Sequence, residues 1–437
     1  MLKTQNTFLK IWFILILIGI ISISFQTILT LPIVGSKIQP PEIIFLLTLL
    51  FLAFNSKKIP FRKLKFNNLD FALIFYLGIV LITSFFAKNF HPFLDFFGLV
   101  YLFLNYLIIR LFLISIGQDF EKIIKTGILW MGIIAAIFGI IGIATTYFFS
   151  ANSLGYIYQD YPYFGDTIRV SGFTSTPHML ASILNISILV LLISMFEKRS
   201  LRSIFVLIIL SLAYIFTFAK IVVLLIIGVI FIFLKKQKIN PIVKNGLRVL
   251  SLSLFVFYMF ATHFILINKS HPNLVEIRNK AFNTGEIIGE TQNNYIIPTT
   301  YTTLKQSAFH LGKKYWITGV GAGNHGSYFN ELKAEGLFPK HIPDYDPHST
   351  YFGSFAETGI FGFVAILYLT FVLFKMSNHL LKTKKYYNLK IATSACLLIF
   401  FMEAISVDAI NFRHLWLVFA ILSAIYNLEQ NEKLGKT

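Results

Sequence analysis

Cysteine, charged residues and several common enzyme motifs are scarce or missing in this 437-residue chain, and each absence excludes a class of protein. Cys396 is the only cysteine, so one chain forms no disulfide framework, cysteine-ligated zinc centre or iron–sulfur cluster. Charged residues make up only 13% of the chain, which is too few for an ordinary soluble domain. The sequence also lacks a Walker-type phosphate loop, a dinucleotide fingerprint and a His-Glu-x-x-His motif, which argues against ATP hydrolysis and zinc proteolysis.

Apolar residues, by contrast, are abundant and come in long runs. Hydrophobic residues make up 56% of the chain, and the mean hydropathy is +0.71. The runs are uninterrupted rather than alternating, which favours helices over a barrel in lipid. The sequence therefore predicts an all-α polytopic membrane protein. Its roughly twelve predicted spans lie at residues 11–25, 43–54, 69–86, 93–116, 128–149, 179–196, 203–217, 221–234, 249–267, 351–374, 391–407 and 415–428.

Lysine and arginine are concentrated in alternate loops, at residues 57–65, 122–125, 198–202, 235–248 and 375–390. Short loops rich in positive charge face the cytoplasm, so both termini are predicted to be cytoplasmic. The chain then divides into nine helices over 1–267, a large extracytoplasmic loop over 268–349, and three helices with a tail over 350–437. Positive-inside topology and anionic lipid headgroups account for the net charge of +18, so no nucleic-acid partner is expected.

The segment 203–234 is long enough either for one helix that contains Lys220 or for two helices with Lys220 at the turn. One span would place the basic residues 235–248 outside, whereas two spans keep them inside. Two spans also spare Lys220 a position at the bilayer centre, which costs about 2.5–3.5 kcal/mol. We therefore predict two short helices with Lys220 at the outer face.

His348 stands in the segment 346–350 (DPHST), where the outer loop enters the tenth predicted span. Asp or Ser caps a helix N-terminus, and Pro fits its first turn. The partial positive charge there favours a neutral imidazole and nearby anions. His348 is therefore a candidate general base beside a phosphate group. The alternative is a polar histidine at the membrane interface that has no chemical role.

Three more cations are predicted on the outer face, where positive charge is otherwise scarce: Arg169, Lys220 and Arg413. Each one alone fits an interfacial anchor, because Lys and Arg extend their charged ends to the membrane boundary. Together they are candidates to converge on a pyrophosphate.

Glu357 and Glu403 lie inside predicted spans, and Asp408 lies near the outer end of one. A carboxylate within a membrane points to a function. Two roles stay open, proton coupling in a transporter and ion pairing that orients a basic residue, and pairing is favoured. Glu357 follows His348 by about 13 Å along a helix, which is too far for direct contact.

Gly319, Gly321 and Gly323 alternate within the segment 316–324 of the outer loop. Glycine lets backbone amides approach a ligand closely, so this glycine run is a candidate supporting element. A plain turn explains it equally well.

The order of three motifs resembles the central signature of the O-antigen ligase and polymerase superfamily. These motifs are the glycine run at 319–324, Pro-His-Ser-Thr-Tyr at 347–351, and Glu-Thr-Gly-Ile-Phe-Gly at 357–362. The resemblance extends outward to Arg169 and to Arg413. The predicted spans, with a large outer loop between the ninth and the tenth, fit the same family.

This resemblance implies a metal-independent glycosyltransferase without a cofactor, in the inner membrane of a bacterium and with its active site on the periplasmic face. The implied donor is an undecaprenyl-diphosphate-linked glycan. Ligases of the family pass the glycan to an outer-facing acceptor such as lipid A-core, whereas polymerases extend one lipid-linked glycan with another. Both activities serve the synthesis of surface polysaccharides such as lipopolysaccharide, and the shared signature leaves the choice between them open.

The resemblance also assigns roles to residues. It implies that His348 activates the acceptor hydroxyl. It makes Arg169, Lys220 and Arg413 candidates to bind or neutralise the leaving diphosphate. Glu357 and the glycine run are then supporting elements.

Some positions depart from the family pattern. Ala219 and Lys220 stand where Ser-Arg is common, so a point charge replaces a bidentate fork. An arginine is common upstream of the glycine run, and Lys305 is a candidate for that place. His178 stands where Asn is common.

Two other classes of function remain open. A transporter or flippase for lipid-linked glycans is motivated by Glu357 and Glu403, although no internal repeat is evident and the outer loop is longer than a carrier needs. A membrane scaffold that binds glycan enzymes is the third class. It predicts indifference to substitution at Arg169, His348 and Arg413.

Overall fold

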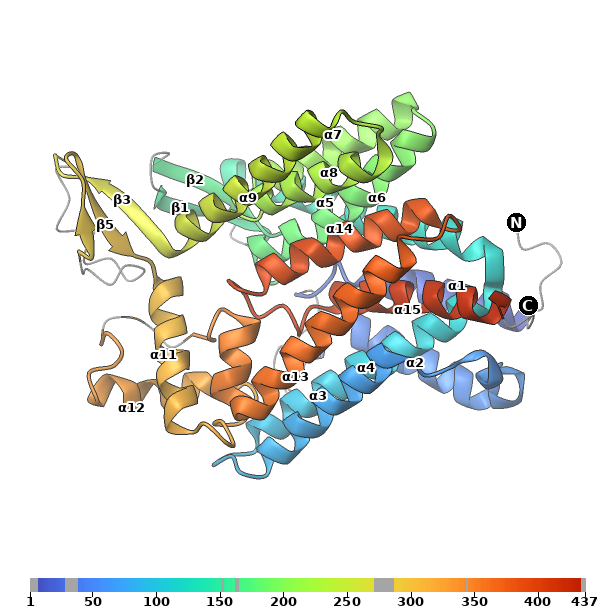
Figure 1. The fold of residues 1–437 in the computed structure, drawn as a ribbon, viewed down its shortest axis with the longest axis horizontal. Coiled ribbons are helices and arrows are strands. Elements are labelled where there is room, and N and C mark those ends of the chain that lie inside the picture. The colour runs from blue at the N-terminus through green and yellow to red at the C-terminus, as the bar shows by residue number, and fades with distance from the viewer. Residues whose placement is uncertain are drawn as a thin grey trace.

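The structure, a computed structural model, is a bundle of helices (Figure 1). It describes residues 7–27, 38–150, 153–161, 165–270, 287–340, 342 and 345–433. Each predicted span corresponds to one of its helices, namely α1 (Thr7–Ser22), α2 (Pro40–Phe54), α3 (Asn68–Ser84), α4 (His91–Ile116), α5 (Phe120–Phe149), α6 (Pro177–Glu197), α7 (Leu201–Ile215), α8 (Val222–Lys236), α9 (Pro241–His263), α13 (Thr350–Leu380), α14 (Tyr387–Glu403) and α15 (Arg413–Lys433).

Several of these helices have the length and composition of membrane spans. Among the described residues, five helices are long and apolar enough to cross a membrane: α4, α5, α6, α9 and α13. α1, α2, α3 and α7 are shorter apolar helices. The fold is therefore consistent with a helical membrane protein, and the crossing of all twelve predicted segments stays a prediction.

The segment around Lys220 forms two helices, as the charge pattern predicted. α7 ends at Ile215 and α8 begins at Val222, and Lys220 lies in the turn between them. The turn keeps the lysine out of both helices.

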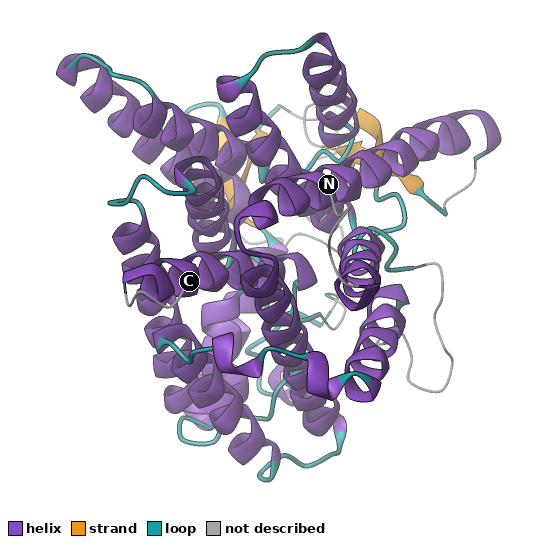
Figure 2. Cartoon of the chain, turned by 90° about the vertical axis from the view of Figure 1, so that its right-hand side faces the viewer, coloured by secondary structure: helices purple, strands orange, loops and turns teal. Residues whose placement is uncertain are grey.

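Short strands and helices gather at one end of the bundle, toward the left of Figure 1 and behind the helices in Figure 2. The all-α prediction omitted the strands, of which two form an antiparallel hairpin and three form a sheet in the order β3-β5-β4. These elements are β1 (Gly155–Tyr161), β2 (Gly165–Val170), β3 (Phe264–Asn268), β4 (Gly289–Glu290), β5 (Asn294–Pro298), α11 (Thr300–Lys314), the 3-10 turn η5 (His325–Tyr328) and α12 (Phe329–Ala334).

The ninth predicted span extends too far. It was expected to reach residue 267, but α9 ends at His263. The apolar residues that follow form β3, which pairs with β5 from Phe264 opposite Pro298 to Asn268 opposite Asn294. Hydropathy cannot separate the end of an apolar helix from an apolar strand that continues it.

The predicted outer loop has a hydrophobic core of its own, separate from the core of the bundle. Apolar side chains of α11 and α12 fill it, among them Leu304, Ala308, Leu311, Phe329 and Leu332. α11 also packs along α13, while α14 packs against α6 and α8. This packing fixes the start of α13, where His348 lies, against both the loop and the bundle.

Candidate active site

His348 lies in a strained turn immediately before α13. Ser349 is the N-cap, and its side chain accepts a hydrogen bond of 3.3 Å from the backbone N–H of Phe352. The helix begins after Pro347, so the expectation that this proline occupies the first turn is wrong. His348 itself has φ of +45°, a left-handed conformation that is uncommon for residues other than glycine and is found at functional sites.

Asp346 holds both the backbone and the ring of His348. Its Oδ1 accepts a 3.1 Å hydrogen bond from the backbone N–H of His348 and also contacts Nδ1 of the imidazole. When Nδ1–H donates to a carboxylate, Nε2 carries the lone pair. Among the described residues Nε2 has no hydrogen-bond partner, and 30% of the side chain is exposed. The imidazole is thus oriented as a proton acceptor that faces outward.

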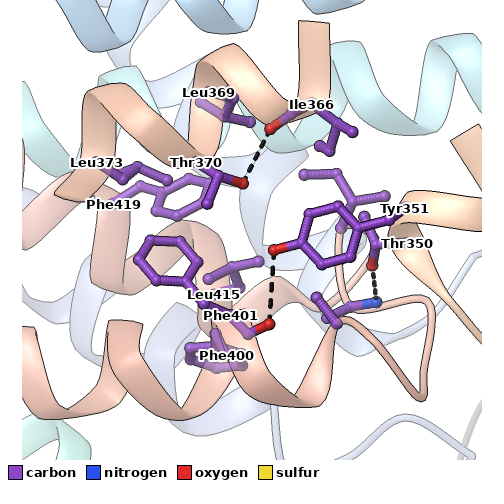
Figure 3. A pocket seen from close by; sticks show the side chains of 13 residues that line it. Thr350, Tyr351, Ile366, Leu369, Thr370, Leu373, Phe400, Phe401, Leu415 and Phe419 are labelled. Atoms are coloured by element: carbon purple, nitrogen blue, oxygen red, sulfur yellow. Dashed lines mark hydrogen bonds between the residues drawn. The ribbon is translucent and has the colours of Figure 1, made fainter. Parts of the chain in front are cut away.

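The residues after His348 anchor the site on the end of α14. The backbone N–H of Thr350 donates to the carbonyl of Ala404 at 2.9 Å. In Figure 3 the Thr350 side chain accepts a 2.8 Å bond from the N–H of Ala409, and the Tyr351 hydroxyl donates to the carbonyl of Phe401 at 3.5 Å. These bonds surround an apolar cavity of about 30 Å³, and they hold the turn of His348 in place.

A basic cluster, defined here as Arg169, Lys220, His263 and Lys305, lies on the same side of the bundle as His348. Lys305 is on α11, the helix whose Tyr301 contacts the ring of His348. Lys305 contacts Nε2 of His263, whose Nδ1 donates to the carbonyl of Met259 at 2.6 Å. His263 interacts electrostatically with both Lys305 and Lys220, and Lys220 interacts in the same way with Arg169. The structure therefore brings together three of the predicted diphosphate ligands and adds His263.

The cations of the basic cluster are bonded to backbone oxygens and rings, not to carboxylates. Arg169 Nε donates to the carbonyl of Thr217 at 3.2 Å, and the guanidinium lies 5.5 Å from the ring centroid of Tyr158. Lys220 Nζ donates to the carbonyl of Ala261 at 2.5 Å. Within the described part of the chain, no carboxylate pairs with Arg169, Lys220 or Lys305.

Burial makes the two lysines of the basic cluster unusually easy to deprotonate. It lowers the pKa of Lys305 to about 7. Burial, and then the nearby charge of Arg169, lower the pKa of Lys220 to about 8. Desolvation disfavours the charged form of an amine unless an anion compensates it. A bound anion would therefore restore the charge of both side chains.

Other buried cations in this protein do have carboxylate partners. Nη1 of Arg110 lies 2.5 Å from Oδ1 of Asp70, with both side chains fully buried. Lys390 contacts Glu429 in the same manner. Because an unpaired buried charge is costly, the unpaired basic cluster is the exception that indicates an external anion.

Arg413, unlike the cations of the basic cluster, is paired with a carboxylate. Its Nε and Nη2 lie 2.7 and 2.6 Å from Oε1 of Glu42, in the first turn of α2. About 15% of each side chain is exposed. The structure thus pairs this predicted diphosphate ligand with a carboxylate.

The glycine run packs against a break in α13. Gly359 has φ of 67° and ψ of −164° inside that helix, and the backbone N–H of Gly321 donates to the carbonyl of Glu357 at 2.8 Å. A Cβ on Gly319 would lie 2.3 Å from the backbone of Glu357. The Glu357 carboxylate accepts hydrogen bonds from the backbone of Gly323 and His325. The close approach that these glycines permit is therefore to α13.

Residues 204–367 match a family model described as O-Antigen ligase. The match of this segment supports the O-antigen ligase superfamily. This confirms the resemblance that the motifs indicated, and it supports a glycosyltransferase-like activity on lipid-linked glycans in general. The matched O-antigen ligase segment contains Lys220, Lys305 and His348, whereas Arg169 and Arg413 lie outside it. No curated protein matches the chain.

A polar cavity of about 240 Å³ opens beside Asp346 and Pro347, the two residues before His348, between residues of the O-antigen ligase segment and residues outside it. Its lining includes Asp346, Glu357, Asp408 and Asp95. Burial, and then the charge of Asp346, raise the pKa of Asp408 to about 7. The volume far exceeds the ~10–15 Å³ that one water needs, so polar molecules have room next to the Asp346–His348 pair. Among the described residues, no group of three or more His, Cys, Asp or Glu is placed to hold a metal ion.

Sequence reasoning missed the pairing of His178 with Glu403. Nε2 of His178, in the first turn of α6, lies 2.7 Å from Oε1 of Glu403 at the end of α14. The favoured expectation, that a carboxylate within a span orients a basic residue, fits this pair. A proline followed by a histidine opens α6, as Pro347 and His348 precede α13, and that repeated pattern was the available signal.

Proposed function

We propose that this protein transfers a glycan from undecaprenyl diphosphate to an acceptor hydroxyl, without a metal ion, at a site formed by His348 and the basic cluster. The observation that carries the proposal is the basic cluster without carboxylates next to a histidine oriented by Asp346. A phosphate-linked donor would supply the anion that the basic cluster lacks. Transfer of its glycan to a hydroxyl would require the proton acceptor that His348 provides.

The donor's diphosphate would be bound by Arg169, Lys220 and Lys305. An arginine offers a planar fork to phosphate oxygens, and a lysine offers a compact charge. Negative charge grows on the diphosphate as the bond to the sugar breaks. Fixed cations placed at that point stabilise the transition state more than the ground state.

The acceptor hydroxyl would be activated by His348. As the hydroxyl oxygen forms its new bond to the anomeric carbon, its proton passes to Nε2. The bond from that carbon to the diphosphate oxygen breaks, and undecaprenyl diphosphate leaves with the electron pair. Asp346 fixes the tautomer and stabilises the imidazolium that results.

α11 joins the two halves of the proposed site. The ring of Tyr301 lies 5.0 Å from the ring of His348, centroid to centroid. Lys305 follows one helical turn later on α11, and side chains at this spacing lie on the same face. One face of a short helix therefore supports both the base and a cation of the basic cluster.

The remaining parts of the proposal follow from the family and the charge pattern. The protein would lie in the bacterial inner membrane among its lipids, with both termini cytoplasmic and the site on the periplasmic face. The acceptor would be lipid A-core or another surface glycan for a ligase, and a second lipid-linked glycan for a polymerase.

The transporter or flippase receives less support. Its motivation was the pair of carboxylates Glu357 and Glu403 inside predicted spans. Glu403 pairs with His178, and Glu357 accepts hydrogen bonds from the backbone of the glycine run. Both carboxylates thus have contacts that account for their presence without proton transport.

The test is glycan transfer by the purified protein in detergent, with a radiolabelled lipid-diphosphate glycan as donor and no added metal. Lipid A-core and a second lipid-linked glycan are offered as acceptors in parallel reactions. A labelled product supports the transferase, and the acceptor consumed distinguishes ligase from polymerase. Flux of the glycan lipid across proteoliposomes without covalent transfer would support the transporter instead.

A further inference from the structure

The protein contains a second histidine that is held by a carboxylate. His178 is paired with Glu403 at 2.7 Å, and 22% of its side chain is exposed while that of Glu403 is fully buried. Ser182, one turn further along α6, contacts the other carboxylate oxygen at 3.3 Å and Nε2 of His414 at 2.9 Å. These contacts fix the position of Glu403 inside the bundle and turn one edge of His178 toward it.

The burial of Glu403 determines what it requires of its partners. A fully buried carboxylate is stable as an anion only when a cation and hydrogen bonds compensate it. Of the described residues, His178 is the one ionisable cation that bonds to Glu403. A protonated imidazole satisfies Glu403 through Nε2–H and keeps a second donor, Nδ1–H, which has no partner in the described part of the chain.

The pair lies next to the groups already placed in the site. The carbonyl of Ala404, directly after Glu403, binds the N–H of Thr350. Tyr258 interacts electrostatically with both Glu403 and Tyr301, and Tyr301 contacts the ring of His348. Arg169 of the basic cluster lies on the strand that precedes α6. The His178–Glu403 pair is therefore connected to Thr350 and, through Tyr258, to Tyr301, on the side of the bundle where the diphosphate would bind.

We propose that His178 binds the diphosphate of the lipid-linked donor through its Nδ1–H, with Glu403 as the positioning residue that holds Nε2 and orients the ring. The proposal rests on the proposed function and deepens it by adding a fourth donor ligand. Between the Glu403 carboxylate and a bound diphosphate, an imidazolium of His178 would donate Nε2–H to one anion and Nδ1–H to the other. His178 would thereby add a cationic ligand to Arg169, Lys220 and Lys305.

The experiment is equilibrium binding of undecaprenyl diphosphate to the full-length protein in nanodiscs, so that no turnover is needed. His178→Gln keeps a donor for Glu403 but removes the charge. We expect it to weaken binding roughly tenfold or more, the range for a hydrogen bond to a charged group. His178→Lys, which restores a cation, should recover much of that affinity. His310→Gln on α11 is the matched control and should bind as the wild type does.

A purely structural role for His178 gives a different pattern. In that case His178→Gln lowers the thermal unfolding temperature but leaves the affinity for undecaprenyl diphosphate unchanged, and this result overturns the proposal. A loss of affinity in His178→Gln that His178→Lys does not recover overturns it as well. If His178→Gln does not fold, the affinity of a folded His178→Lys variant decides, because loss of binding with a cation present contradicts a charge-based role.

The two proposals fail separately. Suppose that the wild-type protein transfers no glycan but its binding of undecaprenyl diphosphate depends on His178. The proposed transferase activity is then rejected, and the proposed diphosphate site is retained. Suppose instead that the wild-type protein transfers the glycan and that His178→Gln does not change the binding. The proposed transferase activity is then retained, and the role of His178 is rejected.

Discussion

The ring of Tyr301 meets the imidazole of His348 edge-on, at 5.0 Å between centroids and an interplanar angle of 62°. This contact ties the proposed base to α11, the helix that also carries Lys305. The apolar face of α11 packs in the core of the outer loop and along α13. The loop therefore serves as a rigid support that fixes the distance between base and cations.

Asp346→Asn should lower kcat while leaving the affinity for the donor unchanged. The amide can still bond to the ring, but it stabilises neither the correct tautomer nor the imidazolium. We expect a loss on the order of tenfold, a fraction of the ~10²–10⁴ that a general base contributes. Steady-state kinetics with varied donor measure it. A raised donor KM at unchanged kcat would assign Asp346 to donor binding instead.

The affinity for undecaprenyl diphosphate should fall as pH rises from 7 to 9. The pKa of Lys305 is lowered to about 7 and that of Lys220 to about 8, so both lose their charge across this window when the site is empty. Arg169 keeps its charge throughout, and His263 is the other titratable group that faces the two lysines. The ligand is already ionised in this range, because the second pKa of a phosphate is about 6.

Lys220→Arg is the matched variant for that pH profile. An arginine stays charged, so the fall in affinity near pH 8 should disappear while the fall near pH 7 remains. Binding in nanodiscs at several pH values measures both. A wild-type affinity that is constant from pH 7 to 9 would contradict the role of the lysines.

Gly319→Ala should prevent folding or sharply lower the thermal unfolding temperature. Its Cβ would lie 2.3 Å from the backbone of Glu357, and φ is +64°. Gly336→Ala is the control, because φ is +72° there but nothing lies within 4 Å of the new Cβ. The control should cost only about 1 kcal/mol of conformational strain. Equal losses in the two variants would show that contact with α13 is not the reason for the glycine.

Arg413→Leu should destabilise the protein rather than weaken donor binding. It leaves Glu42 largely buried without its partner, which costs roughly 1–3 kcal/mol. The double variant with Glu42→Leu should recover much of the thermal stability. Unfolding temperatures of the single and double variants measure the coupling. Loss of affinity for undecaprenyl diphosphate in a folded Arg413→Leu protein would restore Arg413 to the donor site.

The helices were predictable because a helix in lipid must be a continuous apolar run, and each such run can be seen in the sequence. The turn at Lys220 was predictable because charge is expensive at the bilayer centre. The strand after His263 was not, because β3 is as apolar as the end of the helix and its pairing with β5 depends on residues far along the chain.

The candidate site could be proposed from the sequence where its residues lie close together in the chain, but not where residues far apart in the chain meet. His348 and Glu357 fall within a short stretch whose motif order resembles a known family. The pairs His178 with Glu403 and Arg413 with Glu42 join residues separated by 225 and 371 positions. The left-handed turn at His348 was also hidden, since only a few per cent of residues other than glycine adopt a positive φ.

The most direct test of the account is single-turnover glycan transfer by purified wild type, His348→Ala and the control His310→Ala, with donor binding measured on the same samples. The account predicts that all three bind undecaprenyl diphosphate alike, that the control transfers as the wild type does, and that His348→Ala transfers at least ~10²-fold more slowly. Transfer by folded His348→Ala protein at the wild-type rate would contradict the account.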